Sequence, residues 1–142
     1  MGFRIFFFTW IWLPEILNRT RSVKLVELRI SLQKTKIYKL DDLLDTDAKG
    51  LVATVDGKKR NIFIVRKGEQ VFAYLNWCPH NQVLIDQIPD KFFNSDMSYI
   101  QCSKHGALFE INNGLCVEGP CEGEMLRSLD INIEDGIIYL VE

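Results

Sequence analysis

The sequence predicts an all-β fold, an antiparallel β-sandwich or barrel built from short strands. Two observations support this prediction. From Lys36 onward, short runs of alternating apolar and polar residues are interrupted by turn signals about every eight to twelve residues. After residue 50, no segment has the hydrophobic period of a long helix. With 142 residues, the chain has about the length of one domain.

The segment before the first cysteine accounts for the first strands. The expected strands are residues 37–40, 51–55, 61–65 and 71–75, with turns at 41–44, 56–58 and 67–69. We interpret Asp56-Gly57-Lys58 as a hairpin turn, because an Asp-Gly pair readily adopts positive φ angles. The run Lys58-Lys59-Arg60 then belongs to a solvated turn.

The second half of the chain continues the same pattern. The expected strands are residues 99–101, 107–111, 128–133 and 137–141, with turns at 112–114 and 134–136. The chain has no internal repeat and no low-complexity tract. One β domain therefore extends to the C-terminus.

Composition and charge exclude several classes of protein. Hydrophobic residues make up 47% and charged residues 25%, as in a folded globular domain and unlike a disordered chain. The formal net charge is −2 and the pI about 5.7. Since nucleic-acid binding relies on a basic surface that neutralises phosphates, we expect no nucleic-acid partner.

The N-terminal segment, residues 1–35, is interpreted as an extension of a domain at 36–142. Residues 3–13 are apolar except for Arg4 and Thr9, and Pro14 follows soon after. This run is short for a membrane span, which needs roughly 20 apolar residues. Three interpretations stay open: a dispensable extension, an interfacial membrane anchor, and an export signal without a clear cleavage site. We favour the first and expect a cytoplasmic protein.

Two short segments concentrate the chemistry. They read Cys78-Pro79-His80 and Cys102-Ser103-Lys104-His105-Gly106, and they contain both histidines of the chain. Each segment follows an expected strand, so each offers one thiolate and one imidazole from a loop. Two such loops could hold a tetrahedral zinc ion or a 2Fe-2S cluster with two histidine ligands. Zinc sites usually pair like ligands within a segment, so the mixed Cys-x-His and Cys-x-x-His spacing favours two irons.

These motifs resemble those of a Rieske ferredoxin domain. The resemblance rests on both ligand pairs, the glycine after the second histidine, and the later residues Ala107, Phe109, Gly114, Gly119-Pro120-Cys121 and Leu126. It covers the chain from about Lys36 to the end. It implies a 2Fe-2S cluster with Cys78 and Cys102 on one iron and His80 and His105 on the other. It also implies that Gly119-Pro120 lies in a loop that covers the cluster.

The sequence also departs from the respiratory-complex branch of that family. That branch has one extra cysteine in each ligand loop, and the two form a disulfide; Val83 and Lys104 stand at those places here. It also has a serine and a tyrosine that donate to the cluster sulfurs, where this chain has Ala107 and Phe109. Donors to sulfur stabilise the reduced cluster, so their loss predicts a potential in the lower part of the Rieske range of about −150 to +300 mV.

Cys116 and Cys121 are the two remaining cysteines. They could be bridged, act as a redox pair, or serve as small apolar residues. Because the chain shows no clear export signal, we expect them to be reduced and buried.

The expected function is one-electron transfer rather than catalysis. A Rieske cluster has no open coordination position, and the chain has no spare histidine for a mononuclear iron site. We therefore expect a ferredoxin-like carrier, which passes electrons from a flavin reductase to an oxygenase or another acceptor. The alternatives are a redox or iron sensor, a small docking subunit of a larger reductase, and a zinc-binding structural domain.

Overall fold

The fold is that of a computed structural model, which describes residues 33–142. This part of the chain consists of short strands and turns with one 3-10 helix, η1 (Leu40–Asp42), and it confirms the all-β prediction. Within the described residues, no helix is both long and apolar enough to cross a membrane. The three interpretations of the apolar N-terminal run concern a segment outside the described residues.

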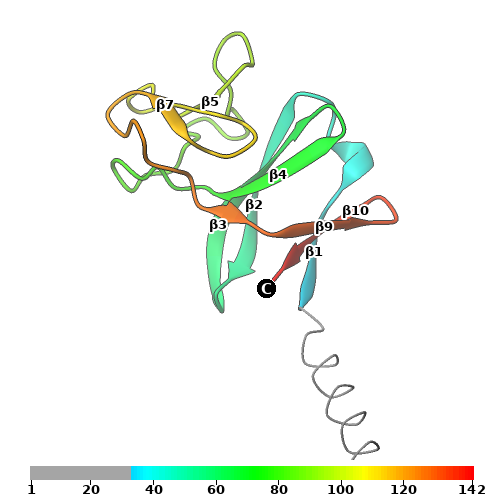
Figure 1. Ribbon diagram of the computed structural model, residues 1–142. Coiled ribbons are helices and arrows are strands. Elements are labelled where there is room, and N and C mark those ends of the chain that lie inside the picture. The colour runs from blue at the N-terminus through cyan, green and yellow to red at the C-terminus, as the bar shows by residue number, and fades with distance from the viewer. Residues whose placement is uncertain (1–32) are drawn as a thin grey trace, which may run out of the picture. The chain divides into compact units, whose positions relative to one another are not determined.

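The strands form three antiparallel sheets (Figure 1). The first sheet contains, in spatial order, β1 (Lys34–Lys39), β10 (Ile137–Val141) and β9 (Ile131–Glu134). The second contains β2 (Asp47–Val55), β3 (Lys58–Lys67), β4 (Gln70–Leu75) and β8 (Ser128–Leu129). The third is small and contains β5 (Ile100–Gln101), β6 (Leu108–Phe109) and β7 (Cys116–Glu118).

Two Asp-Gly pairs make the tight hairpin turns. Asp56 and Gly57 join β2 to β3 with φ angles of 51° and 71°. Asp135 and Gly136 join β9 to β10 with φ angles of 50° and 71°. Two consecutive positive φ values match the twist of antiparallel strands, and Asp-Gly adopts them at low cost. The predicted hairpin at 56–58 is confirmed.

Strand β3 is central because both of its faces are covered. Its residues Ile62, Phe63, Ile64 and Val65 are fully buried. Phe63 and Val65 pack into one apolar core, whereas Ile64 packs with Leu43 and Ile138 in a second. A continuous apolar run is the sequence pattern of a strand covered on both faces.

The structure corrects the expected strands in the second half of the chain. The single strand expected at 128–133 is divided at Asp130: β8 pairs with β4, and β9 pairs with β10 in another sheet. The strand expected at 107–111 shortens to β6, because the chain turns directly after it. Strand β7 was not predicted. Its pairing with β6 depends on contacts that local alternation does not encode.

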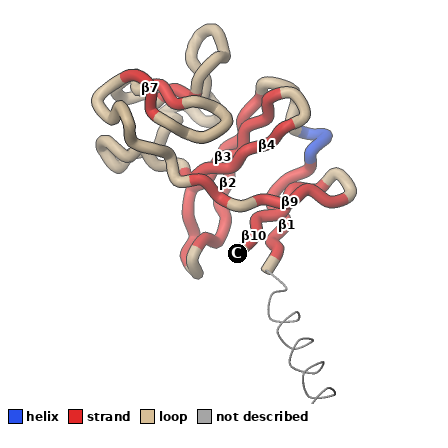
Figure 2. Tube along the Cα trace, in the orientation of Figure 1, coloured by secondary structure: helices blue, strands red, loops and turns tan. Residues whose placement is uncertain are grey.

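The residues between β4 and β8, 76–127, form a separate lobe that we call the loop lobe. Figure 2 shows that it consists mostly of loops, apart from the small third sheet. Aromatic side chains fix it to the second sheet: Phe63 of β3 stacks on Phe92 with ring centroids 4.4 Å apart. Tyr74 of β4 donates its hydroxyl hydrogen to the carbonyl oxygen of Ile111 over 2.8 Å. Both predicted ligand segments lie in this lobe.

Candidate metal centre

The first predicted ligand loop is closed by backbone hydrogen bonds around Cys78. The N–H of Cys78 donates to the carbonyl of Val83 over 2.8 Å, and the N–H of Gln82 donates back to the carbonyl of Cys78 over 2.9 Å. Gln82 has a φ of 55°. The loop therefore turns within five residues and holds His80 at its tip.

The second ligand loop repeats this pattern around Cys102. The N–H of Cys102 donates to the carbonyl of Ala107 over 2.9 Å, and the N–H of Gly106 donates back to Cys102 over 2.9 Å. Gly106 has a φ of 72° and so takes the position that Gln82 takes in the first loop. The two cysteines thus occupy equivalent positions in two similarly closed loops.

Asn76 and Ser103 join the two loops into one unit. Asn76 is buried: its side-chain oxygen accepts the N–H of Ile85 over 2.8 Å, and its amide nitrogen donates to Asp86 over 2.7 Å. The N–H of Ser103 in the second loop then donates to the carbonyl of Ile85 over 2.9 Å. Asn76 gave no signal in the sequence, because its role depends on a partner nine residues further along.

The structure brings the four predicted ligand residues together as two pairs. Cys78 and Cys102 are 1% and 0% exposed, and Cys102 lies close enough to Cys78 to raise the pKa of its thiol. His80 and His105 are exposed, with ring centroids 5.2 Å apart and ring planes at 81°. The sulfur pair thus lies inside and the imidazole pair outside.

The spacing of the two imidazoles fits one metal ion between them. Two imidazoles bound at about 2.0–2.1 Å to a single tetrahedral ion have ring centroids roughly 5 Å apart. His80 and His105 already stand at that separation. Among the described residues, no three His, Cys, Asp or Glu side chains converge closely enough to bind one common ion. A sulfur pair beside a nitrogen pair is the arrangement that a Rieske cluster of two adjacent irons requires.

The environment of Cys78 raises the pKa of its thiol. Burial raises the pKa of Cys78, the backbone N–H groups of His80 and Asn81 lower it, and the neighbouring Cys102 raises it further. A positively charged metal offsets the cost of the thiolate, because it binds the deprotonated sulfur directly.

A third loop packs on the back of the second ligand loop. At Gly119, which has a φ of 114°, a Cβ atom would lie 2.8 Å from the Cα of Ala107 and 3.0 Å from its Cβ. Only glycine permits so close an approach at that backbone angle. Ala107 is fully buried beneath this contact, so Gly119-Pro120 lies directly against the segment that carries His105.

Cys116 and Cys121 flank that third loop as free, buried thiols, as expected. Their sulfur atoms are 3.1 Å apart, and the thiol of Cys116 also lies 3.4 Å from the carbonyl oxygen of Glu118. Since Cys116 can donate to Glu118, Cys121 can donate to Cys116. Burial raises the pKa of Cys121, and its contact with Cys116 raises it further. The Cys121 thiol therefore stays neutral near pH 7.

The described cysteines leave no bridge between the ligand loops. Cys78, Cys102, Cys116 and Cys121 are all free, and Val83 and Lys104 occupy the places of the extra cysteines. Backbone bonds and Asn76 brace the two loops instead.

Comparison with known families agrees with this geometry. Residues 33–131 match the model of the Rieske 2Fe-2S domain. The chain belongs to the Rieske 2Fe-2S domain family. The predicted family, fold class and cofactor class are thereby confirmed. No curated protein matches the chain in sequence.

Several solved Rieske structures share the fold. The ferredoxin of carbazole 1,9a-dioxygenase from Nocardioides aromaticivorans IC177 is 24% identical and aligns with a TM-score of 0.60 over 76% of this chain and 96% of its own. The Sphingomonas yanoikuyae B1 ferredoxin is 19% identical, with a TM-score of 0.60 over 78% and 99%. A chain from a complex of reduced oxygenase and oxidized ferredoxin in carbazole 1,9a-dioxygenase is also 19% identical, with a TM-score of 0.60 over 76% and 92%.

Proposed function

We propose that this Rieske protein is a one-electron carrier whose cluster is held by Cys78, His80, Cys102 and His105. Its electrons would come from a flavin reductase and pass to an oxygenase or another acceptor. The protein itself would not be an enzyme. When bound, the cluster supplies a centre that accepts and returns one electron, and the four side chains hold it between the two loops.

One observation carries this proposal: the sulfur pair is buried and the imidazole pair is exposed. A cluster held in this way would have its histidine-bound iron at the surface. A short path to solvent favours electron exchange with a partner protein. Two of the similar structures named above come from carbazole 1,9a-dioxygenase, which supports an oxygenase as the acceptor.

Anaerobic absorption and EPR spectra, with iron and sulfide assays, test the cluster. We expect about two irons and two sulfides per chain and a rhombic EPR signal after reduction with dithionite. Cys102→Ser should abolish the cluster. Cys116→Ser is the matched control, a buried thiol in the same lobe, and should retain it. One zinc per chain, or loss of iron from both variants, would overturn the ligand assignment.

Electron transfer itself is tested with a reductase. A carrier should be reduced catalytically by a flavin reductase and a nicotinamide cofactor, and should then return each electron to an added acceptor. A redox or iron sensor should instead change its affinity for a partner with cluster state while turning over slowly. Slow reduction combined with a state-dependent affinity would favour the sensor.

A further inference from the structure

A basic groove lies beside the first ligand loop. It has a volume of about 320 Å³ and is lined by Lys59, Arg60, Asn61, Leu75, Asn76, Trp77, Gln82 and Arg127. These residues come from β3, the end of β4, the first ligand loop and the segment before β8. Lys59 and Arg60 form one wall of the groove; the sequence placed them in a solvated turn, whereas the structure places them in strand β3.

Backbone hydrogen bonds fix the shape of this groove. The N–H of Leu75 donates to the carbonyl of Arg127, and the N–H of Asn76 donates to the carbonyl of Asn61, each over 2.9 Å. The buried side chain of Asn76 then links the floor of the groove to Ile85 and Asp86. The groove is preformed, which lowers the entropic cost of binding.

The charge of the groove is positive. Among the described residues that line it, three are cations and none is a carboxylate. Arg127 is partly neutralised by Asp56, at 2.5 Å on the surface. Lys59 and Arg60 take part in none of the ion pairs within the described chain. Two unneutralised cations therefore face a potential ligand.

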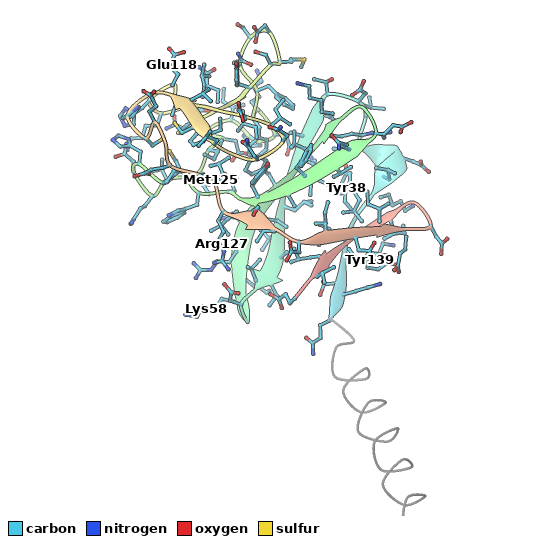
Figure 3. The ribbon with its side chains drawn as sticks, in the orientation of Figure 1. Tyr38, Lys58, Glu118, Met125, Arg127 and Tyr139 are labelled. Atoms are coloured by element: carbon cyan, nitrogen blue, oxygen red, sulfur yellow. The ribbon has the colours of Figure 1, made fainter. Side chains whose placement is uncertain are left out.

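The groove is also continuous with the candidate metal centre. Trp77 directly precedes Cys78 and is 44% exposed. Gln82 donates its N–H to the carbonyl of Cys78. Figure 3 shows Lys58 and Arg127 toward the β2–β3 hairpin, and Glu118 at the far side of the loop lobe. Lys58 and Arg127 thus lie on the hairpin side of the lobe, away from Glu118 (Figure 3).

We propose that this groove docks an acidic segment of the redox partner, with an apolar side chain of that segment against Trp77. The inference rests on the proposed function and specifies the chemistry of the partner surface. An exposed tryptophan surrounded by cations suits a peptide that alternates carboxylates with apolar residues. A partner held there would place its redox centre near His80.

A labelled hexaglutamate peptide is the first probe, with hexalysine as its opposite. Fluorescence anisotropy at low ionic strength should show hexaglutamate binding to the full-length cluster-loaded protein, and about tenfold weaker binding to Lys59→Glu/Arg60→Glu. The matched control is Lys36→Glu/Lys39→Glu, which makes the same charge change at exposed positions in β1. The control should lose less than twofold. The proposed docking site would be overturned if both variants lost the same affinity for hexaglutamate, or if the wild type bound hexalysine more tightly than hexaglutamate.

Electron transfer to small complexes provides the second readout. The reduced cluster gives one electron to hexacyanoferrate(III), an anion, or to hexaamminecobalt(III), a cation. We expect the ratio of the anionic to the cationic rate to fall about tenfold in the groove variant relative to the control variant, and the difference to vanish at high salt. An unchanged ratio would overturn the proposal. A protein with no reducible cluster would instead refute the proposed function, while peptide binding would still report on the groove.

Discussion

At the level of single residues, the expected low reduction potential depends on Ala107 and Phe109. Both are fully buried, and neither has a side-chain hydrogen to donate to a sulfur. Ala107 lies beneath Gly119 and directly precedes β6, which carries Phe109. Near Cys78, the backbone N–H groups of His80 and Asn81 lower the pKa of the thiol, and no side chain of Ala107 or Phe109 can add a donor. A cluster with few donors has a less stable reduced form.

Ala107→Ser should therefore raise the reduction potential. One added hydrogen bond to a sulfur that favours the reduced state tenfold corresponds to about 60 mV for one electron. A redox titration checks this, with Ala53→Ser as the control for adding a hydroxyl to a buried position outside the loop lobe. A rise of the same size in both variants, or a wild-type midpoint well above zero, would contradict the explanation.

Tyr74 offers a second test at a single position. It donates to Ile111, and burial raises its pKa to about 12. Tyr74→Phe leaves a buried carbonyl without a partner, which should lower stability by about 1–3 kcal/mol near pH 8. The folded pKa lies above the unfolded value of about 10, so the wild type should lose stability as the pH rises from about 10 to 12.

Melting temperatures of the two proteins, measured in parallel across that range, check the sign. The wild type should melt several degrees higher at pH 8, and the gap should narrow above pH 10. A gap that widens with pH would show that the phenol is not protected in the fold.

Residue chemistry was also the part most accessible to sequence reading. The predicted ligand set rests on the identity and spacing of two cysteines and two histidines. Asn76 and the groove could not be predicted, because each depends on segments that meet only in the folded chain. Asn76 and Trp77 belong to no spaced motif, so the sequence does not indicate which residues they contact.

At the level of elements, the turns were easier to predict than the strand partners. The Asp-Gly hairpin at 56–57 follows from local backbone preference. By contrast, Asp130 divides an evenly alternating run into β8 and β9, which pair in different sheets. Alternation specifies which face of a strand is buried, but it does not specify the neighbouring strand.

The loop that follows the first ligand segment is tied to β2 by Asp90. Its carboxylate accepts the N–H of Gly50 over 2.8 Å and forms an ion pair with Lys49. The hydrogen bond from Lys49 lowers the pKa of Asp90, and the same contact raises the pKa of Lys49. This contribution is present above the unfolded pKa of Asp90 and is lost as the pH falls through its folded value, so it is complete at pH 7.

Lys49→Met should return the pKa of Asp90 toward its ordinary value and lower stability at pH 7 only slightly, because both side chains are more than one-third exposed. The carboxyl carbon shift of Asp90 in NMR titrations measures the first effect. The melting difference between variant and wild type measures the second and should shrink in 1 M salt. If the pKa of Asp90 were the same in the variant and the wild type, the hydrogen bond from the Gly50 N–H alone would keep that pKa low.

At the level of the whole molecule, the described residues form a compact unit around their own hydrophobic core. Lys34–Glu142 forms one compact unit with three sheets. Its first strand lies at the edge of the first sheet and pairs only with β10 there. Ile37 and Leu40 pack against the core that contains Ile138. We propose that residues 36–142 form the cluster domain and that residues 1–35 are an extension.

Two truncations test this proposal. A chain of residues 33–142 keeps β1 intact and should retain the cluster spectrum, with a melting temperature close to that of the full chain. A chain of residues 41–142 loses β1, which exposes the β10 edge and uncovers Ile138, and it should melt far lower or fail to fold. The second truncation measures how far the melting temperature falls when a structural segment is removed. Equal damage from both would mean that the first 32 residues belong to the domain, because β1 is present in only one of them.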